Sequence, residues 1–239
     1  MDEPAPSPAS DPPAGWLRFA LGDMRLDLPA DRLTPRLRQA LRSGRYERLE
    51  RQMLARLAAE CDGPALDIGG GAGATGIVLA RHLGAGQVTI FEPDPQMAAV
   101  IRHNLALNGQ AGVRVRTGAV IAGKGRGRIA FRRGRAFWSS AAPEEAEGEG
   151  ERLEVPAFGI ETLLAEIRPE LVALDVEGME IELAAPLAAF GPRFVLMELH
   201  RQRYGLPGIA RIFGDMLAGG YAYRPDVSRG AVVGFERLG

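Results

Sequence analysis

ALDIGGGAGATG, at residues 65–76, is the stretch that decides the fold of this chain. It opens with a short apolar run, Ala65–Ile68, and continues into Gly69, Gly70, Gly71 and Gly73. Glycine is required where a backbone takes a positive φ or where a ligand comes within contact distance. We therefore predict a strand, a tight turn and the start of a helix, with a nucleotide-like cofactor at the carboxyl end of the strand.

Two motifs overlap in this stretch and predict different cofactors. Gly71-x-Gly73-x-x-Gly76 fits the dinucleotide fingerprint, whereas Asp67-x-Gly69-x-Gly71-x-Gly73 fits the loop that binds S-adenosylmethionine (SAM). A carboxylate beside a helix N-terminus repels a pyrophosphate, but it accepts hydrogen bonds from an ammonium group and favours a sulfonium. Asp67 therefore favours SAM. An ordinary glycine-rich turn with an exposed aspartate is the alternative without a ligand.

A second acid ends the next predicted strand. Residues 88–92 read VTIFE, and the carboxylate of Glu92 is suitably placed to hold both hydroxyls of a ribose. NAD and SAM both require such an acid, so Glu92 does not separate them. An NAD-dependent oxidoreductase therefore remains an alternative to a SAM-dependent enzyme, as does a SAM-binding protein without catalytic activity.

Strands and helices alternate along most of the chain. This rhythm indicates an α/β fold with a doubly wound, mostly parallel, Rossmann-like sheet. A further helix is expected at 209–217, and a closing antiparallel pair at 221–223 and 231–235. The other strands are predicted at 65–68, 88–92, 113–116, 171–175 and 194–200, and the other helices at 74–82, 95–107, 160–167 and 180–190.

Some segments depart from this alternation of strands and helices, and they set the expected domain boundaries. Residues 1–15 are rich in proline and serine and predict a disordered tail. Residues 16–62 predict a hairpin that turns at Gly22-Asp23, then a helix from Leu37 to about Glu60. Residues 63–239 form the main domain, with a mobile insertion at about 123–153. Within this insertion we expect residues 137–152 to act as a lid over the acceptor site.

Charged side chains gather in the insertion. Arginines lie between residues 126 and 135, and an acidic run follows at 143–151. The arginines are either a solvated face balanced by those glutamates or a binding surface for an anionic substrate under the lid.

Composition bounds the class of partner. The chain has 239 residues, 46% of them hydrophobic, and a net charge of −1. This net charge does not indicate a nucleic acid or an anionic membrane as a partner. Cys61 is the single cysteine, and the first residues lack the basic start and apolar stretch of a signal peptide. No apolar run approaches the ~20 residues of a transmembrane helix. We expect a cytoplasmic protein with a small-molecule substrate, and the oligomeric state stays open.

Four ionisable side chains are predicted to meet at the carboxyl ends of two core strands. Asp175 and Glu177 lie at the end of strand 171–175, and Glu198 and His200 lie at the end of strand 194–200. In a doubly wound sheet these ends line the ligand crevice, where Ala119 is also expected. His200 is the expected general base, because imidazole titrates near neutrality, and Asp175 or Glu177 would orient it or hold the substrate. A structural histidine is the alternative. The set could also bind a divalent metal, but its spacing carries no metal signature and we expect none.

An ordered set of motifs spans about residues 45–200. Its members are Tyr46-Glu47, LDIG at 66–69, Phe91-Glu92-Pro93, Asn104 with Asn108, LDVEGME at 174–180 and MELH at 197–200. This set resembles the FkbM-type SAM-dependent methyltransferases. The resemblance implies the class I methyltransferase fold and O-methylation of a hydroxyl, often on a sugar or a secondary metabolite. The family usually has Ala-Asn in place of Gly70-Gly71 and a lysine in place of Ala173.

The sequence therefore predicts a SAM-dependent O-methyltransferase. Asp67 is expected at the methionyl ammonium group and Glu92 at the ribose diol. Catalysis is expected from His200, Asp175 and Glu177. The predicted cofactor contacts are Asp67, Gly69, Gly70, Gly71, Gly73, Glu92, Pro93, Ala119 and Asp175. We expect a small-molecule acceptor and no nucleic acid or membrane partner.

Overall fold

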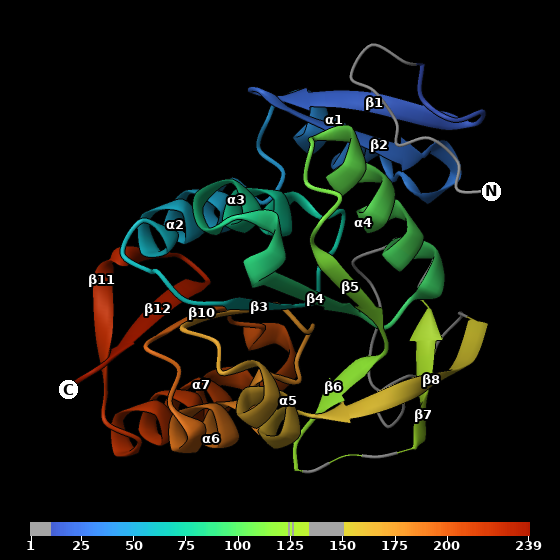
Figure 1. Cartoon of the computed structure of the whole chain (residues 1–239). Coiled ribbons are helices and arrows are strands. Elements are labelled where there is room, and N and C mark those ends of the chain that lie inside the picture. The colour runs from blue at the N-terminus through green and yellow to red at the C-terminus, as the bar shows by residue number, and fades with distance from the viewer. Residues whose placement is uncertain (1–10, 124, 126, 134–150) are drawn as a thin grey trace.

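A seven-stranded sheet forms the centre of the computed structural model, which describes residues 11–123, 125, 127–133 and 151–239 (Figure 1). The five strands from β10 to β5 run parallel, and β12 and β11 close one edge in antiparallel pairing. This arrangement confirms the predicted doubly wound, mostly parallel fold. In spatial order the strands are β11 (Tyr221–Arg229), β12 (Val232–Arg237), β10 (Phe194–Glu198), β9 (Leu171–Leu174), β3 (Ala65–Ile68), β4 (Val88–Glu92) and β5 (Arg114–Thr117).

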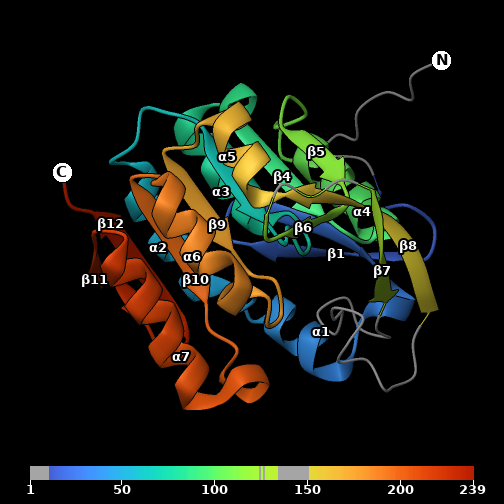
Figure 2. The ribbon, with the colours of Figure 1, turned by 90° about the horizontal axis from the view of Figure 1, so that it is seen from below.

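Helices cover both faces of this sheet (Figures 1 and 2). The apolar residues of β3 and β9 are buried throughout, which is the pattern of strands covered on both sides. One face carries α2 (Arg48–Ala58), α3 (Ala74–Leu83) and α4 (Pro95–Leu107), and the other carries α5 (Ile160–Ile167), α6 (Glu180–Phe190) and α7 (Arg201–Ala218). Short 3-10 turns lie at Ala30–Arg32 and Ala85–Gln87.

Two of the predicted helices have different bounds in the structure. The helix expected from Leu37 to Glu60 is wrong as one element, because it is two helices, α1 (Pro35–Arg42) and α2. Between them Gly44 and Glu47 take left-handed backbone conformations, with φ of 68° and 44°. Helix α7 begins earlier than the expected helix at 209–217 and is interrupted at Gly205, where φ is 64° and ψ is −169°.

A second, smaller sheet lies beside the carboxyl ends of the central strands. It has the order β6 (Ala119–Ile121), β8 (Glu151–Gly159) and β7 (Arg128–Arg133). The sequence reading missed β8, because its first residues, 151–153, fall within the insertion that was expected to be mobile. The expected lid at 137–152 falls, apart from its last two residues, outside the described residues. The same is true of Arg126 and Arg135 in the arginine group.

The predicted N-terminal hairpin is confirmed as β1 (Trp16–Leu21) and β2 (Met24–Pro29), and it packs against α4. The amide oxygen of Asn104, on α4, accepts the backbone N–H of Asp27 at 2.8 Å. The amide nitrogen of Asn104 donates to the carbonyl of Ala72 in the glycine turn at 2.9 Å. One fully buried side chain therefore ties the hairpin to the turn that follows β3.

A buried carboxylate fixes the same junction. Asp27 is fully buried, and each of its carboxylate oxygens accepts a hydrogen bond of 2.7 Å from Arg18. Its Oδ2 also lies 2.8 Å from Nε2 of His103. Burial alone would raise the pKa of Asp27, but the hydrogen bonds from Arg18 and His103 outweigh it and the pKa is lowered. The ionised form is therefore the one that stabilises the fold.

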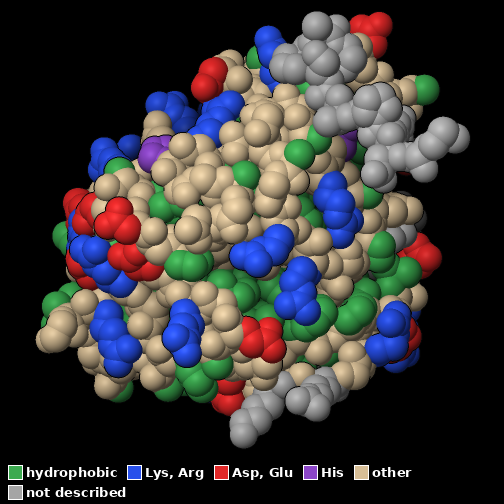
Figure 3. All heavy atoms as spheres, viewed as in Figure 1, with side chains coloured by type: hydrophobic (Ala, Val, Ile, Leu, Met, Phe, Trp, Pro, Cys, Tyr) green, Lys and Arg blue, Asp and Glu red, His purple; other side chains and the backbone are tan. Residues whose placement is uncertain are grey.

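The surface carries charges of both signs. Over β11 and α2, basic and acidic side chains lie together (Figure 3), and Arg224 there pairs with Glu60, Asp226 and Glu236. Among the described residues, no helix combines the length and apolar character needed to cross a membrane.

We predict that Asp27→Asn lowers the free energy of unfolding by about 2–4 kcal/mol, because it leaves Arg18 and His103 without their buried partner. Urea unfolding at pH 7 measures this change. Asp31→Asn, at an exposed position of the same segment, is the matched control and should change stability by less than about 0.5 kcal/mol. A depressed carboxyl pKa contributes stability above its unfolded value, so the wild-type advantage should disappear as the pH falls below about 4. Equal stability of the two variants would contradict the proposed role of Asp27.

Candidate active site

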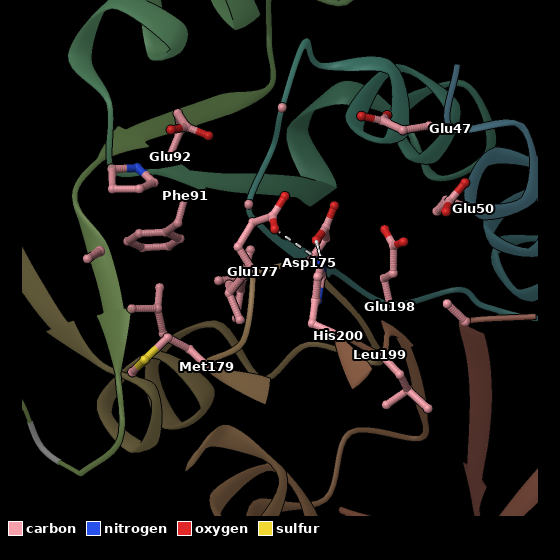
Figure 4. A pocket seen from close by; sticks show the side chains of 18 of the residues that line it. Glu47, Glu50, Phe91, Glu92, Asp175, Glu177, Met179, Glu198, Leu199 and His200 are labelled. Atoms are coloured by element: carbon pink, nitrogen blue, oxygen red, sulfur yellow. Dashed lines mark ion pairs between the residues drawn. The ribbon is translucent and has the colours of Figure 1, made fainter. Parts of the chain in front are cut away.

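A cavity of about 700 Å³ opens at the carboxyl ends of β3, β4, β9 and β10 (Figure 4). This is the crevice where doubly wound sheets bind ligands. Its wall includes most of the residues that the sequence predicted: Gly69, Gly71, Glu92, Pro93, Ala119, Asp175, Glu177 and His200. It also includes Glu47, Glu50 and Glu198.

The glycine turn after β3 packs directly against the backbone that follows β9. The N–H of Gly69 donates to the carbonyl of Phe91 at 2.9 Å, and the N–H of Asp175 donates to the carbonyl of Ile68 at 2.9 Å. Gly69 has a φ of +92°, and a Cβ at this position would lie 1.7 Å from the carbonyl oxygen of Asp175. Only glycine fits there, which holds the turn and the candidate catalytic loop in contact.

Asp67 lies beneath this turn and not in the cavity wall. Its side chain is 2% exposed, and its carboxylate accepts a hydrogen bond of 2.8 Å from the hydroxyl of Thr75. Burial raises the pKa of Asp67 to about 7, and the bond from Thr75 offsets part of that rise. Gly70 and Gly73 are also absent from the wall, since both pack against Ile101. Asp67, Gly70 and Gly73 therefore support the glycine turn from the side away from the cavity and do not line it.

Glu92 ends β4 and borders the cavity next to Phe91 and Pro93 (Figure 4). Its carboxylate accepts the backbone N–H of Asp94 at 2.9 Å. Burial raises the pKa of Glu92 to about 8, while hydrogen bonds from the backbone of Asp94 and Gly71 pull it down. A carboxylate held by the backbone in this way is a fixed acceptor for a diol.

Glu47 is a cavity residue to which the sequence reading gave no role. The break between α1 and α2 brings it and Tyr46 against the glycine turn, and the hydroxyl of Tyr46 accepts the N–H of Ala72 at 3.3 Å. The oxygen Oε1 of Glu47 lies 2.9 Å from the position that a Cβ of Gly71 would take. Its other oxygen, Oε2, is buried and has no hydrogen-bond partner. Burial raises the pKa of Glu47 to about 8. The positive φ of Glu47 directs this side chain, and the sequence gives no sign of a positive φ at a residue other than glycine.

His200 lies among the carboxylates at the other end of the cavity, and the structure brings the four predicted ionisable groups together (Figure 4). Its Nδ1 is 3.1 Å from Oε1 of Glu180, and its Nε2 is 3.3 Å from Glu177 and 3.6 Å from Asp175. Glu180, which is fully buried, also accepts the N–H groups of Val176 and Gly178. The sequence reading gave Glu180 no role, although its place in the LDVEGME motif was a signal.

The protonation of this cluster bears on the predicted base. Burial alone would lower the pKa of His200, but the bond to Glu180 and the nearby carboxylates outweigh it, so the pKa is raised. Both ring nitrogens of His200 face carboxylate oxygens in this arrangement, and its role as the general base stays a prediction. Burial raises the pKa of Glu177 to about 7, and the charge of His200 offsets part of that rise. Burial and neighbouring acids raise the pKa of Asp175 and of Glu198.

Comparisons with known proteins agree with this architecture. Residues 67–223 match the model of the methyltransferase FkbM domain. An O-methyltransferase from Bacillus cereus, solved in complex with S-adenosylhomocysteine (SAH), is 12% identical with a TM-score of 0.50, over 88% of this chain and 84% of that one. A tRNA (uracil-54, C5)-methyltransferase from Pyrococcus abyssi, also solved with SAH, is 14% identical with a TM-score of 0.50, over 93% of this chain and 44% of that one. At these identities the likeness is one of fold. No curated protein sequence matches the chain.

We predict that Gly69→Ala destabilises the protein more than Gly84→Ala does. Both glycines have nearly the same positive φ, +92° and +90°, but only the new Cβ at Gly69 meets another atom within 4 Å. The control therefore carries the backbone strain alone, about 1–3 kcal/mol. The clash with the carbonyl of Asp175 should add about 1–3 kcal/mol in denaturant unfolding. Equal losses would show that the turn and the Asp175 loop are not in tight contact.

Proposed function

The chain belongs to the FkbM methyltransferase family, and we propose that it transfers the methyl group of SAM to a hydroxyl of a small molecule, such as a sugar or a secondary metabolite. One observation carries this proposal. A single cavity joins the glycine turn and Glu92 at one end to the carboxylate and histidine cluster at the other (Figure 4). The first end fits a nucleoside and an amino acid, and the second fits a polar acceptor.

The cavity residues fit the parts of SAM. We assign the ribose hydroxyls to Glu92, and the adenine ring to the apolar wall of Phe91, Ala119 and Val120. We assign the ammonium group to Glu47 in place of Asp67, because Oε2 of Glu47 is buried and unpaired and its Oε1 lies beside Gly71, whereas Asp67 is bonded to Thr75. A cationic ligand is favourable here because its positive charge pairs with carboxylates that are shielded from water.

The acceptor is assigned to the end of the cavity near His200. SAM supplies an electrophilic methyl group there, so the chain has to align the acceptor oxygen and take up its proton. We assign the proton to Glu177, whose carboxylate borders the cavity and lies 3.3 Å from Nε2 of His200. His200 then holds Glu177 in position. The backbone of Glu177 has a φ of 54°, a strained conformation of the kind that clusters at functional sites.

The charge of the cavity supports a small hydroxylic acceptor over RNA. Six acidic side chains line the cavity, Glu50, Asp175, Glu177 and Glu198 among them, against the three arginines Arg36, Arg45 and Arg48. A nucleic acid would bring its phosphates toward these carboxylates, and phosphate backbones are bound by basic side chains. A neutral polyol avoids that repulsion and offers donors to the same oxygens.

We predict that Glu92→Gln and Glu47→Gln each weaken SAM binding by about 1.5–3 kcal/mol, or roughly 10- to 150-fold in Kd, as expected for charge-assisted hydrogen bonds. Calorimetric titration with SAM and SAH measures the loss. SAH keeps the ammonium group but lacks the sulfonium, so both ligands should lose affinity if the assignments hold. Asp67→Asn should have a smaller effect than Glu47→Gln, and the exposed control Glu166→Gln should have none. Unchanged SAH affinity in Glu47→Gln would remove Glu47 from the site, and binding of NAD in place of SAM would favour an oxidoreductase.

We also predict methyl transfer from labelled SAM to a hydroxylic compound in a panel of sugars and polyols, with tRNA included as a competing acceptor. Glu177→Gln should lower kcat by about 10²–10⁴-fold and leave the Kd for SAM within a few fold, because it removes a proton acceptor and no cofactor contact. His200→Gln tests the positioning role, and its loss should not add to that of Glu177→Gln. SAM binding without transfer to any acceptor would favour a non-catalytic protein. Transfer to tRNA alone would overturn the small-molecule assignment.

A further inference from the structure

The geometry points to a divalent-cation site formed by Asp175, Glu198 and His200 at the acceptor end of the cavity. A carboxylate oxygen from each acid and one imidazole nitrogen all lie within 4.8 Å of one another. Asp175 directly follows β9 and Glu198 ends the neighbouring parallel strand β10, so the sheet register sets their spacing. The trio was not recognisable as a metal motif from its spacing in the sequence.

The first support is an oxygen without a partner. Oδ1 of Asp175 is buried and has no hydrogen-bond donor, and its ion-pair contact among the described residues is with Nε2 of His200 at 3.6 Å. Leaving a buried acceptor unpaired is costly, more so when it is charged. A cation coordinated by this oxygen would remove that cost.

The second support is the way in which His200 is held. His200 is 5% exposed, and its Nδ1 pairs with the fully buried Glu180, which the backbone N–H groups of Val176 and Gly178 fix in turn. This pairing leaves Nε2 directed at Asp175 and Glu177. A carboxylate on one ring nitrogen is the arrangement that orients metal-binding histidines, and an ion at Nε2 would take the place of its ion pairs with Asp175 and Glu177.

The third support is the local charge. Asp175 stands between Glu177 and Glu198, and Glu47 and Glu50 border the same cavity (Figure 4). Neighbouring carboxylates that are partly buried repel one another, and a divalent cation would offset the repulsion.

The donor set indicates the class of ion. Two carboxylates and one imidazole suit a first-row divalent ion such as Mn²⁺ better than Ca²⁺, which takes oxygen ligands. Three protein ligands leave coordination positions open. A role of the divalent ion in turnover rests on the proposed methyl transfer. In that reaction, a hydroxyl bound to the ion would release its proton more readily.

Mn²⁺ binding to the full-length protein tests the site without SAM or any acceptor. Electron paramagnetic resonance titration should show one tightly bound Mn²⁺ per chain, and pulsed measurements should detect coupling to an imidazole nitrogen. Glu198→Gln and Asp175→Asn should each weaken binding by at least about tenfold. His200→Gln should abolish the nitrogen coupling, and a thermal melt of each variant checks that it folds. Glu50→Gln, in the same cavity but outside the trio, is the matched control.

Two outcomes would overturn the proposal. One is Mn²⁺ affinity weaker than about 1 mM in the wild-type protein. The other is an equal loss in Glu198→Gln and Glu50→Gln, which would indicate general attraction to an acidic cavity. Because the readout needs no methyl transfer, loss of the metal site would leave the SAM assignments standing. Failure to methylate any acceptor would likewise leave the measured Mn²⁺ affinity unchanged.

Discussion

The contact between the glycine turn after β3 and the backbone after β9 governs the rest of the site. Gly69 and the carbonyl of Asp175 come so close that any Cβ would collide. This contact holds the two ends of the proposed site together, because one side of it carries the glycine turn and the other carries Asp175 and Glu177. Methyl transfer requires the reacting atoms to be aligned at short distance. Two backbone segments in direct contact provide such alignment, because they restrict each other's movement.

Buried acids give the cavity its chemical character. Burial raises the pKa of Glu47 and of Glu92 to about 8, so each of these side chains gains from a nearby positive charge. SAM carries an ammonium and a sulfonium, and the proposed divalent ion would add charge at the opposite end. A single electrostatic feature thus relates the proposed cofactor and the proposed metal.

The N-terminal segment is part of the site and not an appendage to it. Asn104 connects the hairpin to the glycine turn, and Asp27 fixes the hairpin through Arg18 and His103. The break after α1 then delivers Tyr46 and Glu47 to the same turn. The match to the methyltransferase FkbM domain begins at residue 67, after these elements.

The sequence by itself determined the sheet, its helices and the end of the sheet that holds the cavity. Apolar periodicity and glycine spacing are local signals, and they sufficed to predict the turn at Gly69 and the convergence of Asp175, Glu177, Glu198 and His200. Only the tertiary structure decided what each acid faces. Asp67 and Glu47 differ in role because one packs under the turn against Thr75 and the other reaches over it from a left-handed residue between two helices. Burial, like-charge neighbours and unpaired oxygens arise from residues distant in the chain, and they set the pKa of His200 and the metal-binding geometry in ways that no linear spacing records.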